Sequence, residues 1–105
     1  MERLTLLGLP LDPVDKEEAL KRIGGFLQDE RTHQVVTLNP EIAVRAQEDE
    51  ALRRAVLEAE LVTPDGVGIL WAVRRLHGLS LKERVTGIDL TLALLRRFPG
   101  VRVYL

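Results

Sequence analysis

Apolar positions along the 105-residue chain recur with two different periods, and the changes of period mark the predicted elements. Apolar residues spaced three and four positions apart predict helices, whereas short apolar runs bounded by Gly, Pro or Asn predict strands. The predicted strands are residues 3–9, 33–38, 61–63 and 101–105, and the predicted helices are residues 15–27, 40–60 (with a break near 48–50), 68–76 and 88–98. Strands that alternate with helices of this length indicate βαβ units. The predicted fold class is therefore α/β, with a Rossmann-like, mostly parallel sheet and flanking helices.

Individual residues indicate where several of the predicted helices and strands begin or end. Asp15 followed by Glu18 resembles a capping box, which is typical of a helix start. Asn39 before Pro40 is typical of a helix whose cap is Asn and whose first residue is Pro. Pro10 and the turn signal Asp12-Pro13 are predicted to end the first strand.

The last apolar run, Val101–Leu105, predicts a strand with no helix after it. A parallel sheet needs cover on both faces, so the fold is predicted to be incomplete at its carboxyl end. We also expect this run, and the helix that carries Ile69, Leu70 and Val73, to leave apolar surface uncovered. Exposed surface of that kind predicts association into a homo-oligomer.

Composition excludes several classes of function. The chain has 15 cations, 16 acidic residues and a net charge of -1, so no basic field favours nucleic acid. Cysteine is absent, which excludes disulfides and thiolate chemistry. No apolar run approaches the roughly 20 residues that span a bilayer, and no signal peptide opens the sequence, so we expect a cytoplasmic protein. The densest cationic pairs are predicted to lie on solvated helix faces; they are Arg53-Arg54, Arg74-Arg75 and Arg96-Arg97.

Polar residues follow two of the predicted strands where a ligand site is expected. In open α/β sheets, ligands bind at the carboxyl ends of strands beside helix amino termini. Thr37 is either an ordinary strand residue or a hydroxyl that faces this crevice. Asn39 is either a helix cap alone or an amide that also donates to a sugar hydroxyl or a phosphate.

Asp65, between Pro64 and Gly66, has two interpretations. It either stabilises its own turn or provides a carboxylate that acts as a general base. Gly66 and Gly68 supply free amide groups at a helix start, which suits an anion such as a diphosphate. Further along, Arg84 either forms a surface salt bridge or neutralises a diphosphate through bidentate hydrogen bonds. Asp89 is interpreted as the cap of the last helix.

Three runs in this order and at this spacing are specific to a family. They are Thr37–Glu41 (Thr-Leu-Asn-Pro-Glu), Leu61–Gly68 (Leu-Val-Thr-Pro-Asp-Gly-Val-Gly) and Glu83–Asp89 (Glu-Arg-Val-Thr-Gly-Ile-Asp). Together with the opening Leu-Gly-Leu-Pro-Leu-Asp segment, they resemble the WecG/TagA/CpsF glycosyltransferases (glycosyltransferase family 26). The resemblance covers the whole chain and is strongest to the TagA-type N-acetylmannosaminyltransferases.

The resemblance implies an activity and a set of site residues. Members of this family transfer a sugar with inversion, typically N-acetylmannosamine, from a UDP-sugar to undecaprenyl-diphosphate-linked N-acetylglucosamine, as in teichoic acid synthesis. Asp65 matches the position of the family's base, and Thr37, Asn39 and Arg84 match pocket positions. No cofactor is implied, and metal-independent transfer is expected, because Arg and helix amino termini take the diphosphate charge and no Asp-x-Asp motif occurs.

Family members continue past the length of this chain, which bears on domain organisation. The resemblance implies that residues 1–105 are the amino-terminal part of a single glycosyltransferase domain, with the carboxyl-terminal remainder absent. In the full-length protein, a carboxyl-terminal appendage is expected to complete the site and to contact the inner face of the plasma membrane. One alternative is a truncated, non-catalytic α/β module that binds a nucleotide or a partner chain through its sheet edge. A phosphate-binding regulatory domain, with Asp65 as phosphoacceptor, is disfavoured because no receiver-like acidic cluster is evident.

Overall fold

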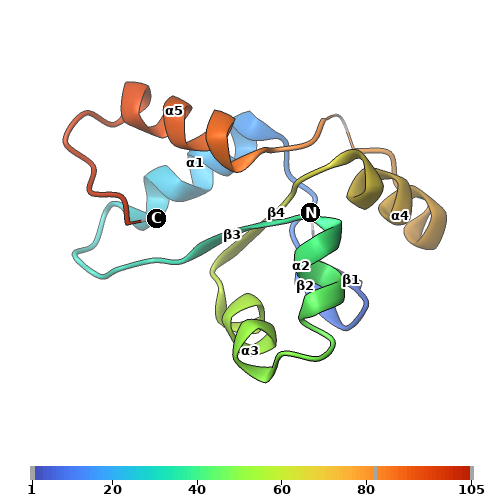
Figure 1. Ribbon diagram of the computed structural model, residues 1–105. Helices are drawn as coiled ribbons and strands as arrows, with labels where there is room; N and C mark the ends of the chain where they lie inside the picture. Colours follow the sequence, from blue (N-terminus) through green and yellow to red (C-terminus); the bar gives the residue numbers. More distant parts are fainter. Residues whose placement is uncertain (1, 82, 105) are drawn as a thin grey trace.

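Two pairs of strands and five helices make up residues 2–81 and 83–104, the part of the chain that the computed structural model describes (Figure 1). The predicted α/β class is confirmed, and neither of the two sheets formed by this part is closed. In chain order the elements are β1 (Leu4–Leu6), β2 (Leu9–Leu11), α1 (Lys16–Phe26), β3 (Val35–Leu38), α2 (Pro40–Arg45), α3 (Glu50–Glu58), β4 (Leu61–Pro64), α4 (Val67–His77) and α5 (Gly87–Arg97).

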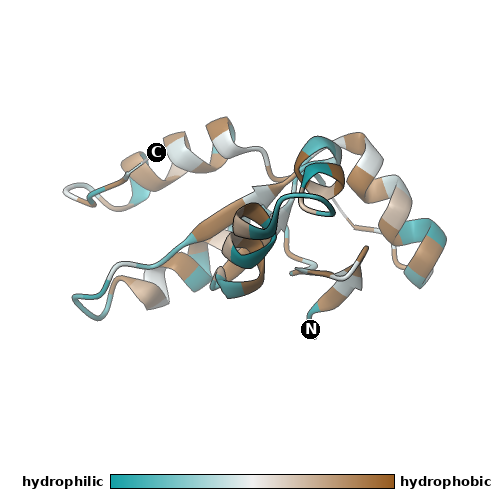
Figure 2. Ribbon diagram, turned by 60° about the horizontal axis from the view of Figure 1, so that its bottom comes forward, coloured by the Kyte–Doolittle hydropathy of each residue, from teal (hydrophilic) through white to brown (hydrophobic). Residues whose placement is uncertain are grey.

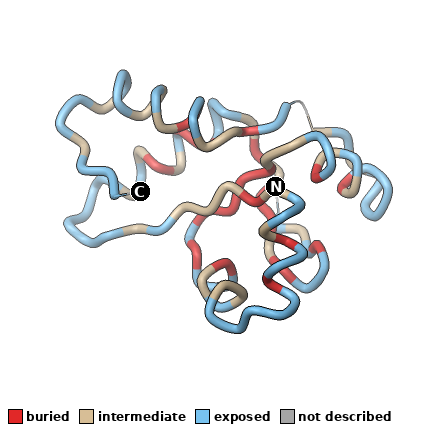
Figure 3. Tube along the Cα trace, viewed as in Figure 1, coloured by how far each residue is buried: buried red, intermediate tan, exposed pale blue. Residues whose placement is uncertain are grey.

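The centre of the fold is the parallel pair β3–β4, in which Thr37 lies opposite Thr63. Alternate residues of these strands enter two separate cores, so both faces of the pair are covered, as a parallel sheet requires. On one face, Leu38 and Val62 pack with the β1–β2 hairpin, α2, α3 and α4. On the other, Leu61 packs with α1 and α5. Figure 3 shows that the buried stretches gather at the centre of the fold, whereas α5 and the far end of α4 are largely exposed.

The prediction of a single strand at residues 3–9 is wrong, because this segment is an antiparallel hairpin. Leu7 and Gly8 both have positive φ, +51° and +77°, which is the geometry of a tight two-residue turn. Pro10 lies inside β2 opposite Thr5, one pair beyond the hydrogen-bonded pair next to the turn. Adjacent pairs alternate between bonded and non-bonded, so Pro10 removes no ladder hydrogen bond. Its presence therefore does not end the strand.

The predicted strand at the carboxyl end is also wrong for Val101–Tyr104, which form no strand, and Leu105 lies outside the described residues. The Val101 amide donates to the carbonyl of Phe98 at 3.1 Å and continues the turn that follows α5. Strand propensity is not enough here, since a strand needs a neighbouring strand to pair its backbone groups.

The predicted helix starts are confirmed by their capping hydrogen bonds. The Asp15 carboxylate accepts from the amide of Glu18 at 2.8 Å, and Asn39 Oδ1 accepts from the amide of Ile42 at 2.8 Å. The predicted break between residues 40 and 60 is also present, where Asp49 caps α3. Such caps are local interactions, each of which contributes about 1 kcal/mol.

Asp12 is a buried carboxylate that joins the hairpin to the central sheet. Arg3 binds it through two nitrogens at 2.9 and 3.1 Å, and the Arg22 guanidinium lies 3.7 Å away. The amide of Val62 donates to Asp12 Oδ2 at 2.7 Å, and the amide of Asp12 donates back to the Val62 carbonyl at 2.8 Å. The sequence predicted only a turn at this position.

His33 connects the ends of three elements. Its ring stacks on Phe26, with ring centroids 4.9 Å apart. Nε2 lies 2.7 Å from Asp29 Oδ1, and Nδ1 contacts the carboxylate of Glu60, which precedes β4. Hydrogen bonds to Asp29 and then to Glu60 raise the pKa of His33, and the His33 ring in turn lowers the pKa of Asp29.

We expect the thermal unfolding midpoint to fall as the pH rises above about 6.5, the ordinary pKa of His. The raised pKa means that the folded state holds the His33 proton more tightly. This stabilisation is fully present below the unfolded pKa and is lost as the pH rises through the folded pKa. The lowered pKa of Asp29 keeps its contribution in place above its unfolded pKa, and that contribution is lost only as the pH falls through its folded pKa. Melting curves across this range for the chain and for His33→Gln check the prediction. An equally steep profile in the variant would assign the dependence to other groups.

Candidate functional site

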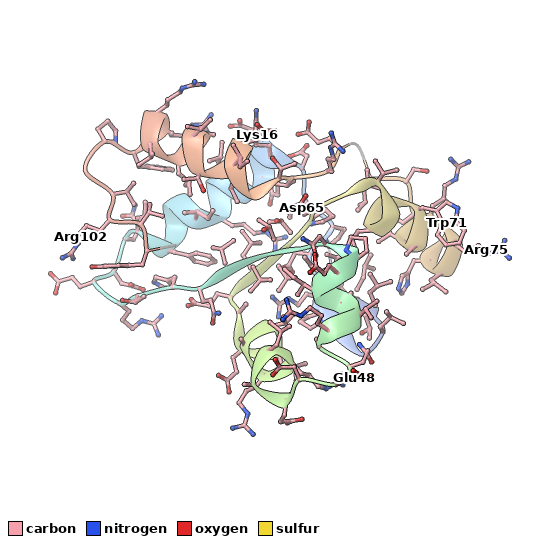
Figure 4. All side chains as sticks on the ribbon, viewed as in Figure 1. Lys16, Glu48, Asp65, Trp71, Arg75 and Arg102 are labelled. Atoms are coloured by element: carbon pink, nitrogen blue, oxygen red, sulfur yellow. The ribbon has the colours of Figure 1, made fainter. Side chains whose placement is uncertain are left out.

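The carboxyl ends of β3 and β4 carry the residues that the sequence singled out. The amide of Asp65 donates to the carbonyl of Leu38 at 2.8 Å, so the ladder continues one step beyond β4 and places Asp65 beside Asn39. Strand residues alternate between faces, which assigns Thr37 and Asp65 to the same face, the one covered by α1 and α5. Figure 4 shows Asp65 near the middle of the molecule, at the end of β4. The structure therefore brings Thr37, Asn39 and Asp65 together, as predicted.

The amino ends of α2 and α4 pack against each other through glycines. A Cβ atom at Gly68 would lie 2.9 Å from Pro40 Cγ, and one at Gly66 would lie 3.4 Å from Pro40 Cδ. Gly66 also has a φ of +103°, which favours glycine. Gly68 is thus needed for the close approach of α4 to α2, whereas Gly66 is needed for its backbone conformation.

The start of α5 also lies at the carboxyl ends of β3 and β4. A Cβ atom at Gly87 would lie 3.3 Å from Thr37 Oγ1, so α5 begins directly against the Thr37 hydroxyl. The amide of Val85 donates to the carbonyl of Pro64 at 2.6 Å, and the buried Thr63 hydroxyl donates to the Val85 carbonyl at 3.5 Å. Sequence reasoning did not assign a function to Thr63, Val85 or Gly87, although they lie in the runs that carry the family resemblance.

Asp65 is half-buried, and its carboxylate makes no hydrogen bond or ion pair with any residue that the structure describes. Within the same part of the chain, every fully buried side-chain nitrogen or oxygen has a partner, so this carboxylate is open to solvent. The interpretation of Asp65 as the residue that stabilises its own turn is therefore not supported. Asn39 fits both of its interpretations, because Oδ1 caps α2 and the Nδ2 amide has no partner among the described residues.

In residues 83–86, which precede α5, every side chain except that of Arg84 is buried or makes a hydrogen bond. Glu83 accepts from the amide of Lys16 at 3.1 Å, Val85 is buried, and Thr86 caps α5 by accepting from the amide of Asp89 at 3.1 Å. The cap is thus Thr86, and the interpretation of Asp89 as the cap is wrong. Arg84 is exposed and forms no hydrogen bond or ion pair with the described residues, so the surface salt bridge is not observed.

Helix α4 differs from the other four described helices at its amino end. Asp15, Asn39, Asp49 and Thr86 cap α1, α2, α3 and α5 through their side chains, whereas Gly66 offers α4 no side-chain cap. The Ile69 amide donates to the Gly66 carbonyl at 3.1 Å, so the amides of Val67 and Gly68 are the ones that remain available to an anion, beside the Asp65 carboxylate, which has no partner among the described residues.

Two hollows on the described surface lie away from this site. One of about 270 Å³ lies on α4, and a second of about 550 Å³ lies beside α3. Neither is lined by Thr37, Asp65 or Arg84. The described residues contain no group of three or more His, Asp or Glu side chains arranged to hold a metal ion. None of their helices has the length and apolar character needed to cross a membrane.

Comparison with known proteins gives a family and two relatives. A profile described as the glycosyl transferase WecG/TagA/CpsF family matches residues 4–105. An N-acetylglucosaminyldiphosphoundecaprenol N-acetyl-beta-D-mannosaminyltransferase of Bacillus spizizenii is 33% identical over 70 residues, which cover 67% of this chain and 27% of the relative. A Staphylococcus aureus protein of the same description is 29% identical over 90 residues, which cover 84% of this chain and 35% of the relative. The chain thus spans a minor part of the length of these relatives.

Proposed function

The chain belongs to the WecG/TagA/CpsF family of glycosyltransferases, and on that premise we propose that it carries the donor side and the base of an inverting sugar transfer. The donor is a UDP-sugar, and the acceptor is N-acetylglucosamine linked to undecaprenyl diphosphate at the cytoplasmic face of the membrane. Both relatives are named for transfer of N-acetylmannosamine to this acceptor, which makes that sugar the proposed one. The observation that carries the proposal is the carboxylate of Asp65, which lies among three helix starts and has no partner among the described residues.

The proposed reaction needs one base. Asp65 takes the proton of the acceptor hydroxyl as that oxygen attacks the anomeric carbon from the face opposite UDP. The bond between the anomeric carbon and the β-phosphate oxygen breaks, and its electron pair leaves on UDP, so the configuration inverts. A carboxylate already engaged by the protein would be a poorer base, which is why its free state supports this role.

The leaving diphosphate needs compensation for its charge. We assign this to Arg84 and to the uncapped amino end of α4, where Gly66 and Gly68 expose backbone amides. Thr37 and the Nδ2 amide of Asn39 are assigned to the donor sugar. Charge compensation by these groups is consistent with transfer that requires neither a metal ion nor a cofactor.

Titration of the chain with UDP, followed by backbone amide NMR, tests this assignment. We expect the largest shifts at Gly66, Gly68 and Gly87, and we expect Arg84→Gln to weaken UDP binding by about 10- to 100-fold, because it removes charge-assisted hydrogen bonds. Arg102→Gln is the matched control, since Arg102 is also exposed but lies far from Asp65 (Figure 4). Shifts confined to the hollow beside α3, or equal losses in both variants, would place the nucleotide elsewhere.

A second candidate is a non-catalytic α/β module that binds a nucleotide or a partner chain. The observation that favours it is the outer edge of β3, which pairs with no other strand in the described part of the chain. Transfer activity in the whole protein separates the two candidates, because a binding module retains UDP affinity without turnover.

We also propose self-association. Apolar surface is exposed on α4 as expected, at Val67 and Trp71, although Ile69 and Val73 of the same helix are buried. A second apolar stripe, to which we assign self-association, runs along α5, where Ile88, Leu92 and Leu95 are exposed at helical spacing. We expect light scattering to show a concentration-dependent dimer that Leu92→Glu dissociates. A monomer at all concentrations would contradict this expectation.

A further inference from the structure

One face of α4 combines exposed apolar and basic side chains. At 3.6 residues per turn, Val67, Trp71, Arg74 and Arg75 fall within an arc of about 100°. Val67 and Trp71 are 66% and 67% exposed, whereas Val73 on the opposite side is buried. Figure 4 shows Trp71 and Arg75 at the outer end of α4, directed away from the rest of the molecule, and Figure 2 shows apolar stretches along most of this helix. We call Val67, Trp71, Arg74 and Arg75 the α4 face.

The charges of the α4 face are not neutralised by any residue in the described part of the chain. Arg74 and Arg75 are exposed and make no hydrogen bond or ion pair with any residue that the structure describes. No residue of α4 is acidic. By contrast, Arg97 on α5 binds the carboxylate of Glu17 at 2.6 and 3.1 Å. The two free arginines and Trp71 line the hollow of about 270 Å³, so two guanidinium groups flank an exposed indole.

This combination fits the headgroup region of a lipid bilayer. Arg binds phosphate groups through paired hydrogen bonds, and Trp is favoured at the membrane interface, where its ring meets both apolar and polar surroundings. A second copy of the chain is a poorer occupant. In a two-fold contact the same face meets itself, which would bring four guanidinium groups together with no acidic residue of α4 between them.

The α4 face also leads away from the candidate site. It begins at Val67, two residues after Asp65, and extends about 12 Å along the helix to Arg75. We propose that the α4 face docks on an anionic membrane surface, with Trp71 at headgroup level and Arg74 and Arg75 on lipid phosphates. This orientation would place the Asp65 end of α4 at the surface where a lipid-linked acceptor lies, and in that respect it rests on the proposed function.

Vesicle binding tests the proposal without any catalytic step, so its outcome is independent of the transfer assay. Trp71 is the only tryptophan of the chain, so its fluorescence reports directly on the α4 face. We expect its emission to shift to shorter wavelength with vesicles of phosphatidylcholine that contain roughly one-third phosphatidylglycerol, and not with phosphatidylcholine alone. Arg74→Gln/Arg75→Gln should weaken partitioning into the anionic vesicles by about 30-fold, from the loss of two arginines near the surface.

Arg54→Gln/Arg96→Gln is the matched control, because it removes the same charge from exposed positions on α3 and α5. Retained binding by this control, together with loss by Arg74→Gln/Arg75→Gln, supports the proposal. Three results would overturn it. They are absence of binding to anionic vesicles, equal losses in the two double variants, and a concentration-dependent blue shift without vesicles, which would show that a second copy covers Trp71.

Discussion

Replacement of Asp65 by Asn is expected to lower the rate of sugar transfer in the whole protein by about 100- to 10,000-fold, the usual contribution of a positioned general base. Asn has the size of Asp but cannot take the proton of the acceptor hydroxyl. The carboxylate has no partner among the described residues, so its replacement removes no interaction that the fold uses. We therefore expect an unchanged melting temperature and nearly unchanged UDP affinity.

Turnover of UDP-N-acetylmannosamine with a lipid-diphosphate-linked N-acetylglucosamine acceptor is the decisive measurement, alongside UDP affinity. Asp89→Asn is the matched control, because Asp89 is an exposed carboxylate in the first turn of α5 and does not cap it. Near-normal turnover in Asp65→Asn would show that another group is the base. A joint fall of turnover, UDP affinity and melting temperature would show that the carboxylate has a structural role.

Replacement of Asp12 by Ala is expected to lower the free energy of unfolding by about 2–4 kcal/mol, a large share of the stability of a domain of this size. The change removes the carboxylate that accepts from the buried amide of Val62 and that binds Arg3. Both guanidinium partners of Asp12 are partly exposed and keep contact with water, which limits the loss.

Urea unfolding followed by circular dichroism measures this effect. Asp12→Asn retains an oxygen for the amide of Val62 and loses the ion pairs, so we expect an intermediate loss. Asp49→Ala is the comparison for a purely local role, since Asp49 only caps α3 and its removal should cost about 1 kcal/mol. If Asp12→Ala destabilises the chain no more than Asp49→Ala does, the hairpin is not held to β4 through Asp12.

Elements that depend on neighbours in the sequence were predicted well. Asp15, Asn39 and the break near Asp49 were recognised because a cap involves one side chain and an amide three residues later. The strands at β3 and β4 were recognised because both are short apolar runs bounded by turn residues. The α/β class followed from the order of these elements.

Elements that depend on residues distant in the sequence were predicted poorly. The run Val101–Tyr104 has the composition of a strand, but none of the described strands pairs with it. The segment with Gly8 became a hairpin because Leu9 and Leu11 are buried against the central sheet, which the local pattern does not show. Asp12 looked like a turn residue, and its role became visible only with Arg3 and Val62 beside it.

By itself the sequence determined the family, the order of the elements and the polar residues at two strand ends, because these follow from residue types and spacing. It left open whether Asn39, Asp65 and Arg84 act within the fold or toward a ligand. The tertiary structure decided which of their groups have protein partners: Asn39 Oδ1 caps α2, while the Asp65 carboxylate and the Arg84 guanidinium have none among the described residues. Hydrogen-bond occupancy depends on groups brought together from distant positions, so only the folded chain reveals which side chains remain free to bind a ligand.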